Sequence, residues 1–311
     1  DRGGTAVKAA LCEEDGTLLC KQSAPTPTGD APALCAAMKQ LALALCAERG
    51  VSPDSITSIG IGVPGSFDKA TCTLKFGTNL GMRNVCFADA FRPEFSCTVQ
   101  LDNDANCAAL GEATAGAAKN ARNMLMVTLG TGVGGGIIIH GQVYSGSNFA
   151  GGELGHSVIV CGGASCTCGR KGCWEAYSSA TALIRMTREA MAAHADKKDT
   201  PIWEITGGSF DTVDGRTAFD AMRKGDPLGK EVVDKYISYL ACGVANCINV
   251  FQPDTLCIGG GISNEGENLL APLRELVEKE TYNTNGSKQT QICRAKLGND
   301  AGIIGAALLG E

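Results

Sequence analysis

One histidine and three cysteines stand close together in the middle of the chain: His156, Cys166, Cys168 and Cys173. An imidazole and three thiols at this spacing form the ligand set of a Cys3His zinc site, which is tetrahedral and closed when it is structural. Four protein ligands leave no position for a zinc-bound water. We therefore expect a structural zinc, and a zinc hydrolase is disfavoured.

Two carboxylates flank this cluster, Glu153 before it and Glu175 after it. Each could be an ordinary solvated surface acid. On a loop fixed by zinc, they could instead accept hydrogen bonds from a bound ligand and discriminate against ligands that leave them unmatched. Cys161 is a conceivable alternative metal ligand, but the pattern favours it as the end of an apolar strand.

A third acidic position, Asp104, closes the run Asp102-Asn103-Asp104. This run follows a predicted strand over 97–101 and precedes an alanine-rich predicted helix over 105–118. Asp104 could cap that helix, or it could act as a general base at a strand end.

Glycine accounts for 41 residues and concentrates in turns beside predicted strands. Gly130–Gly136 follows a strong predicted strand over 124–129 and matches G-x-G-x-x-G. A dinucleotide-binding motif must open a helix, whereas residues 137–144 are typical of a strand and turn. We therefore predict a hairpin whose backbone N–H groups could hold phosphate oxygens. A plain flexible hairpin is the alternative.

Two further glycine turns lie at Gly3–Gly4, before the first predicted strand, and at Gly259–Gly261, after a predicted strand over 255–258. The first strand continues into a hairpin with its turn at Asp15-Gly16. Asp30 can cap a helix over 31–49, and Gly50 can end it. Other elements are predicted as a strand at 56–63, helices at 180–195, 216–224, 227–251, 264–281 and 301–309, a loop at 196–213, and a last strand at 292–297.

These elements predict a mixed α/β protein of two domains. We place the boundary near 118–123. The first α/β domain would span 1–118 and be completed by the last helix, about 299–311. The second, over 119–298, would carry the zinc site.

The length, composition and net charge of the chain exclude several classes of protein. The chain has 311 residues, 44% of them hydrophobic, and a net charge of −6, which argues against nucleic acid as a partner. No apolar run reaches the roughly 18 residues that span a bilayer, and no signal peptide is visible. Most of the 16 cysteines stand on apolar faces, as expected of small buried hydrophobes in a reducing, cytoplasmic compartment. Because the chain begins at Asp1, we expect part of its natural start to be absent.

Together, the glycine turns, the run Asp102–Asn106, the segment Gly152–His156 and the pattern Cys-x-Cys-Gly-x-x-Gly-Cys-x-Glu over 166–175 resemble the ROK family of sugar kinases and repressors. The resemblance covers essentially the whole chain and is greatest to bacterial glucokinases. It implies an actin-like (ribonuclease H-like) ATPase fold, with two domains and a cleft between them. Closure of such domains over the sugar would exclude water from the phosphate.

The resemblance also implies roles for individual residues. It assigns the catalytic base to Asp104, and zinc to His156 and the three cysteines. The expected sugar ligands are Gly65, Asn79, Asn103, Asp104, Glu153, His156 and Glu175. The expected nucleotide contacts are Asp1, Gly3, Gly4, Thr5, Lys8, Gly130, Thr131, Gly132, Gly134, Gly135, Gly259, Gly260 and Gly261, with Asp1 also helping to hold Mg²⁺.

The implied activity is transfer of phosphate from ATP to a hexose, with glucose 6-phosphate as the expected product and a homodimer or homotetramer as the expected assembly. Two positions depart from the family pattern: Arg2 replaces an apolar residue, and Met82 stands where glucokinases often have Trp. N-acetylmannosamine, fructose and allose remain alternative substrates. A sugar-responsive transcriptional regulator of the same family is the alternative function, although no helix-turn-helix module is present in this sequence.

Overall fold

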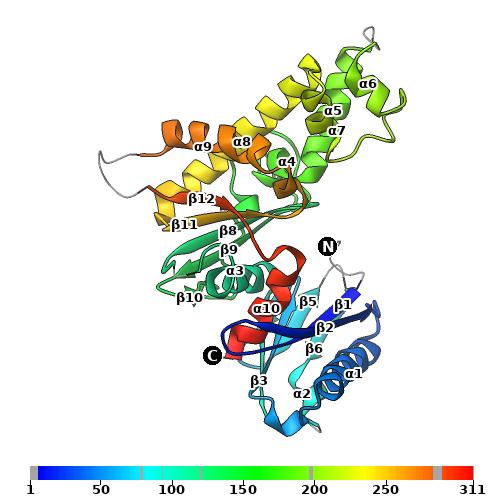
Figure 1. Ribbon diagram of the computed structural model, residues 1–311, viewed down its shortest axis with the longest axis vertical. Helices are drawn as coiled ribbons and strands as arrows, with labels where there is room; N and C mark the ends of the chain where they lie inside the picture. The colour runs from blue at the N-terminus through cyan, green and yellow to red at the C-terminus, as the bar shows by residue number, and fades with distance from the viewer. Residues whose placement is uncertain are drawn as a thin grey trace. The chain divides into compact units, whose positions relative to one another are not determined.

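A computed structural model describes residues 6–77, 80–92, 94–119, 121–195, 199–282 and 289–310 (Figure 1). The chain divides into two compact units. The first comprises Asp1–Met126, Gly136–Gly152 and Ala295–Glu311, and the second comprises Val127–Gly135 and Glu153–Arg294. The sequence predicted domain boundaries near 118–123 and before the last helix. The two units divide in addition within the hairpin and loop over residues 127–152.

The first unit begins with an antiparallel hairpin of β1 (Ala6–Cys12) and β2 (Leu18–Pro25). The Asp15 carboxylate accepts the Thr17 N–H at 2.8 Å, and Gly16 has φ of 80°, which favours glycine. The predicted turn at Asp15-Gly16 is therefore confirmed.

Helix α1 (Ala31–Arg49) has the bounds that its sequence signals predicted. Asp30 accepts the Ala33 N–H at 2.9 Å, and Gly50 ends the helix in the left-handed conformation. By length and composition this helix could cross a membrane, contrary to the expectation that no segment could. Its Leu34, Leu41 and Leu45 side chains are buried in the unit.

Strands β3 (Ser58–Val63) and β7 (Thr98–Asn103) pair in parallel, so that Val63 lies opposite Asn103. Between them in sequence is a small antiparallel sheet of β4 (Ser66–Asp68), β5 (Thr73–Gly77) and β6 (Met82–Cys86), followed by α2 (Ala88–Phe91). These short elements were not predicted, because segments of three to five residues carry little periodicity.

Helix α3 (Asp104–Thr114) lies beside α10 (Ala301–Ala307) in the first unit (Figure 1). The helices approach through glycines. A Cβ on Gly305 would lie 1.7 Å from the Cys107 carbonyl oxygen, and one on Gly111 would lie 2.3 Å from that of Ala301. The predicted helix over 105–118 was too long, since α3 ends at Thr114.

The buried Glu112 on α3 also holds two other segments. Its carboxylate accepts backbone N–H groups from Ala117 at 2.7 Å, Lys296 at 3.0 Å and Leu297 at 2.7 Å. The connection that leads into α10 is thereby fixed to α3.

A five-stranded sheet has the order β10 (Gln142–Val143), β9 (Val133–Ile139), β8 (Met124–Leu129), β11 (Thr255–Gly259) and β12 (Gln291–Arg294). Strands β8 and β9 are neighbours joined by Gly130–Gly132. The prediction of a glycine-rich hairpin, rather than a dinucleotide-binding turn that opens a helix, is confirmed.

The second unit is mostly helical beyond its strands. Its α-helices are α4 (Glu175–Ser178), α5 (Ala180–Ala193), α6 (Pro201–Ile205), α7 (Thr217–Arg223), α8 (Pro227–Phe251) and α9 (Glu267–Glu280). Helix α6 corrects the predicted loop over 196–213. The predicted helix over 264–281 is a 3-10 turn, Gly261–Glu265, followed by α9.

The long helix α8 supports the segment that carries the cysteines. Asp226 caps α8 by accepting the Leu228 N–H at 2.8 Å. The buried Trp174 packs against Gly243, where a Cβ would lie 2.0 Å from the indole ring. Because Trp174 directly follows Cys173, α8 packs against the base of the cysteine-bearing loop.

Candidate active site and metal centre

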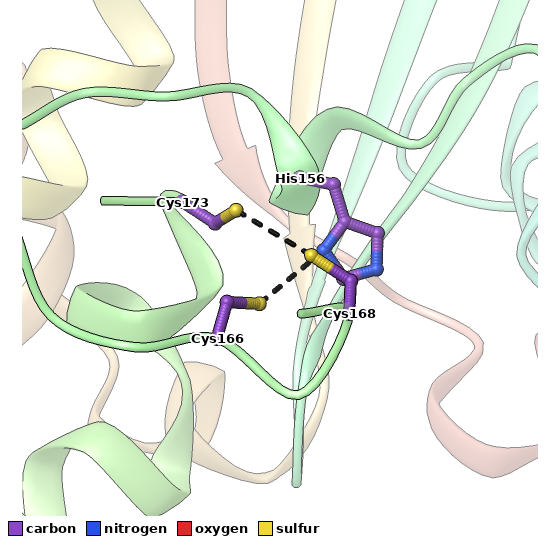
Figure 2. Close-up of side chains that lie close together, drawn as sticks. All are labelled: His156, Cys166, Cys168 and Cys173. Carbon is purple, nitrogen blue, oxygen red and sulfur yellow. Dashed lines mark hydrogen bonds between the residues drawn. The ribbon is translucent and has the colours of Figure 1, made fainter. Parts of the chain in front are cut away.

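His156, Cys166, Cys168 and Cys173 converge from one loop of the second unit (Figure 2). Their ligand atoms all lie within 4.8 Å of one another. The Cys166 Sγ is 3.6 Å from His156 Nδ1, and the Cys168 Sγ is 3.7 Å from the Cys173 Sγ. The structure thus brings together the four residues that the sequence grouped. Cys161 is exposed and lies outside the group.

Two of the separations between these atoms fit a tetrahedral zinc. With Zn–S near 2.3 Å and Zn–N near 2.05 Å, tetrahedral ligands would lie about 3.8 Å apart for two sulfurs and about 3.6 Å apart for sulfur and nitrogen. The Cys166–His156 and Cys168–Cys173 separations agree with these values to about 0.1 Å. Nδ1 of His156 is the nitrogen that faces the thiols, which leaves Nε2 for another partner.

Local hydrogen bonds shape the loop before any metal binds. The Cys166 N–H donates to the Arg170 carbonyl at 2.9 Å, and the Arg170 guanidinium donates to the His156 carbonyl at 3.0 Å. The Tyr177 hydroxyl accepts the Ala164 N–H at 2.7 Å. These bonds close the two arms of the loop on each other, so the ligands are largely preorganised.

The thiols differ in their electrostatics. Burial raises the pKa of Cys173 to about 12, while the hydrogen bond from the Arg170 N–H lowers the pKa of the exposed Cys168. Burial also raises the pKa of Cys166. A metal ligand must be a thiolate, so metal binding would release protons from the two raised thiols.

The flanking acids lie in different surroundings. Glu153 is exposed at the start of a 3-10 turn, Leu154–His156. Glu175 is partly buried. One of its oxygens, Oε1, accepts the Thr167 hydroxyl at 3.0 Å, and the other, Oε2, accepts the Val133 N–H at 3.1 Å. Glu175 is therefore not simply a solvated surface acid.

Two of the predicted glycine turns lie side by side in the second unit. Gly260 has φ of 80°, and a Cβ there would lie 2.4 Å from the Leu129 carbonyl oxygen. Leu129 immediately precedes the Gly130 turn. The turns at Gly130–Gly132 and Gly259–Gly261 thus share one edge of the sheet, and Gly134 and Gly135 continue from the first into β9.

In the first unit, the run Asp102–Asp104 occupies the junction of β7 and α3. Asn103, and not Asp104, is the N-cap: its side-chain oxygen accepts the Ala105 N–H at 2.8 Å and the Asn106 N–H at 3.3 Å. Within the described part of the chain, the amide NH2 of Asn103 makes no hydrogen bond. The cap role proposed for Asp104 as an alternative to the base is therefore filled by its neighbour.

Asp104 projects its carboxylate at the start of α3. It reaches solvent, yet the surrounding protein displaces enough of its hydration to raise its pKa, against the opposing hydrogen bond from the Ala105 N–H. A raised pKa is common for acids and bases that take part in catalysis. Among the described residues, its Oδ2 receives no hydrogen bond.

The neighbouring Asp102 is fully buried and belongs to a network that the sequence did not predict. Its Oδ1 accepts the Asn106 side-chain amide at 2.8 Å, and its Oδ2 faces Lys69 at 3.1 Å and Ser145 at 3.5 Å. The i, i+4 spacing of Asp102 and Asn106 was the only available signal. Lys69 and Ser145 are too distant in sequence to have been found.

A cavity of about 530 Å³ lies within the first unit, and Asp104 is among its lining residues. The remaining lining comes mainly from apolar residues of β1, α1 and β3, such as Val7, Leu34 and Ile61. A hexose needs several hydrogen-bonding partners, so this apolar space does not suit a sugar. Volume alone does not identify the site.

Other predicted contacts are distributed as follows. Gly65 follows β3 with φ of 115°, and a Cβ there would lie 2.3 Å from the Phe76 carbonyl oxygen, so only glycine fits. Lys8 lies on β1. Five predicted site residues fall outside the described residues: Asp1, Gly3, Gly4, Thr5 and Asn79.

The ROK family model matches residues 1–311. The glucokinase of Halalkalibacterium halodurans is 36% identical, over 99% of this chain and 93% of that protein. The Thermotoga maritima glucokinase is 35% identical, over 99% and 94%. A crystal structure of a ROK family glucokinase from Streptomyces griseus, in complex with glucose and AMPPNP, superposes with a TM-score of 0.78 at 31% identity, covering 98% of this chain and 96% of that one.

These matches run the length of the chain and include both units. The expected α/β actin-like ATPase fold is thereby confirmed.

Proposed function

Since this protein belongs to the ROK family, we propose that it is an ATP-dependent hexose kinase that converts glucose to glucose 6-phosphate. The observation that carries this proposal is the whole-length similarity to glucokinases at 35–36% identity. The positions of Asp104 and of the two glycine turns in the second unit also support it.

Asp104 serves as the general base. In phosphoryl transfer, the protein contributes mainly positioning and electrostatic stabilisation. The unoccupied Oδ2 of Asp104 accepts the proton of the sugar hydroxyl as its oxygen attacks the γ-phosphorus, and ADP leaves. The raised pKa brings this carboxylate closer to the pH at which a base is most effective.

The sugar is bound by polar groups that the family pattern assigns, namely Gly65, the amide of Asn103, Glu153, Glu175 and the Nε2 face of His156. Asn79 joins them on the family pattern. Each carboxylate accepts sugar hydroxyls, and unmatched hydroxyl patterns would leave a desolvated acceptor, which costs about 1–3 kcal/mol.

The phosphates of ATP contact the backbone N–H groups of the Gly130–Gly135 turn, and Gly259–Gly261 lies on the adenosine side. The close approach of Gly260 to Leu129 supports this arrangement, because it places both turns at one edge of the sheet. Residues 1–5 and Lys8 complete the phosphate site on the family pattern. Mg²⁺, held in part by Asp1, would offset phosphate charge.

Zinc has a structural role at His156 and the three cysteines. It would fix the loop so that His156 Nε2 and Glu175 keep their orientation. The fit of the ligand separations to a tetrahedral ion supports this assignment.

The protein is further proposed to act in the cytoplasm as a homodimer or homotetramer, with no nucleic-acid or membrane partner. The net charge of −6 supports the absence of a nucleic-acid partner, and the oligomeric state rests on the family pattern.

The test is a coupled assay of ATP consumption over a panel of glucose, N-acetylmannosamine, fructose and allose, with and without Mg²⁺. We expect turnover with glucose at the highest kcat/KM, and only with Mg²⁺. Tight glucose binding without turnover of any sugar would contradict the kinase and favour a sugar-responsive regulator. Preference for another hexose would change the proposed substrate and leave the proposed kinase activity in place.

A further inference from the structure

Hydrogen bonds join the Gly130–Val133 turn to a nearby segment, Glu175–Thr181. The Ala180 N–H donates to the Gly130 carbonyl at 2.8 Å, and the Thr181 hydroxyl donates to the Thr131 carbonyl at 2.8 Å. The Val133 N–H donates to Glu175 Oε2 at 3.1 Å. Three hydrogen bonds thus fix a turn of four residues from one side.

The Glu175 carboxylate also packs directly on the turn. A Cβ placed on Gly132 would lie 2.3 Å from Glu175 Oε2. Glycine at position 132 therefore makes room for the carboxylate, and the contact limits the positions that the turn can take.

The same segment continues directly from the metal centre. Cys173 is a predicted ligand, Glu175 lies two residues later, and Thr181 stands in the first turn of α5. Thr167, between two predicted ligands, donates its hydroxyl to Glu175 Oε1 at 3.0 Å. Both oxygens of Glu175 are thus engaged, one by the loop of the metal centre and the other by the glycine turn.

We propose that Thr181 and Thr167 are positioning residues for the nucleotide: Thr181 acts directly on the Thr131 carbonyl, and Thr167 acts through Glu175. This inference rests on the proposed function, because it takes the Gly130 turn as the phosphate site. Neither threonine touches the substrate. Their hydroxyls hold the turn so that its other N–H groups, besides those of Gly130 and Val133 that are bonded within the protein, face the phosphates without a cost of ordering when ATP binds.

Thr181 permits the cleaner test, because Glu175 is itself a proposed sugar ligand. Thr181→Val keeps the shape of the side chain and removes the hydroxyl. Thr290→Val is the matched control: the Thr290 hydroxyl also donates to a backbone carbonyl, that of Pro253, at 2.8 Å, but away from the turn. Thr181→Ser restores the hydroxyl and should rescue the defect.

The measurements are the Kd of AMPPNP with Mg²⁺ and the Kd of glucose by titration calorimetry, together with KM for each substrate. We expect Thr181→Val to weaken AMPPNP binding and raise KM for ATP by about three- to tenfold, the equivalent of one lost hydrogen bond. The Kd of glucose should stay within about twofold of the wild-type value. Thr167→Val should act in the same direction with a smaller effect.

Equal AMPPNP affinity in Thr181→Val and Thr290→Val would overturn the inference. Equal losses of glucose and AMPPNP binding in Thr181→Val, without rescue by Thr181→Ser, would also overturn it, because that pattern indicates general destabilisation.

The experiments distinguish a failure of this inference from a failure of the proposed function. A wild-type protein that binds AMPPNP more tightly than Thr181→Val but phosphorylates no sugar would contradict only the function. A wild-type protein that binds no nucleotide would contradict both.

Discussion

Asp104, the proposed base, and Glu175, a proposed sugar ligand, are positioned in different ways. Asp104 in the first unit is set by its sequence neighbours, since Asn103 caps α3 and Asp102 bonds Asn106 four residues away. Glu175 in the second unit is set by Thr167 and by Val133, which is 42 residues away. A locally built site depends on the start of one helix, whereas a site built from distant segments depends on the fold around it.

This difference predicts that changes at Asp104 lower the rate of phosphoryl transfer and leave glucose binding intact. Changes in the loop that carries His156 and the three cysteines, here called the metal loop, should weaken glucose binding. Asp104→Asn keeps the shape and removes the base, so kcat should fall by about 10²- to 10⁴-fold. Glucose binding, measured by calorimetry, should change little.

The exposed Asp54, in the first unit, is a matched control, and Asp54→Asn should leave kcat unchanged. Near-normal turnover of Asp104→Asn would remove Asp104 from the mechanism.

The metal loop should respond in the opposite way. Cys168→Ser, or removal of metal with a chelator, should reduce bound zinc and weaken glucose binding by about 10- to 100-fold, because the ligand-bearing loop loses its fixed shape. Far-UV circular dichroism should keep most of its helical signal, since α8 and α9 lie outside the loop.

Cys161→Ser is the control for this experiment, since Cys161 is exposed near the cluster but is not one of its members. Normal glucose affinity in metal-free protein would show that zinc does not shape the sugar site.

A third experiment tests the support of α3, on which Asp104 stands. Glu112→Ala leaves three backbone N–H groups without their buried acceptor. We expect the free energy of unfolding to fall by about 3 kcal/mol, measured from the denaturation midpoint.

Glu189 provides the comparison, because its ion pair with Arg185 lies on the surface of α5. Glu189→Gln should cost about 0.5 kcal/mol or less. Similar midpoints for the two variants would indicate that Glu112 does not hold the segment leading into α10.

The smallest expected effect is on the pH profile. Asp104 must be ionised to act as a base, and loss of hydration raises its pKa above the ordinary 3.8. The logarithm of kcat/KM for glucose should therefore fall as the pH decreases through a value above 3.8. An acid limb at or below that value would contradict the raised pKa.

The raised pKa of Asp104 makes the folded protein less stable as the pH increases. Since the pKa of Asp104 is higher in the folded state, its contribution to stability is present below pH 3.8 and is lost as the pH rises through the folded pKa. Asp104→Asn should therefore not destabilise the protein at neutral pH.

Much of the fold was predictable wherever the signals are local. The predicted bounds of α1 and α8 agree with the structure, because both helices have a capping Asp and a clear end. The small sheet of β4, β5 and β6 was missed, because its strands are held by pairing with one another and not by their own patterns.

By itself the sequence determined the grouping of His156 with three cysteines, the hairpin context of Gly130 and the position of Asp104 after a strand, because each depends on residue types within a few positions. Only the tertiary structure decided that Asn103 takes the cap, that Lys69 pairs with Asp102, and that Glu175 and Thr181 hold the Gly130 turn. Hydrogen bonds between distant segments depend on how the chain folds back on itself, and no local pattern records them.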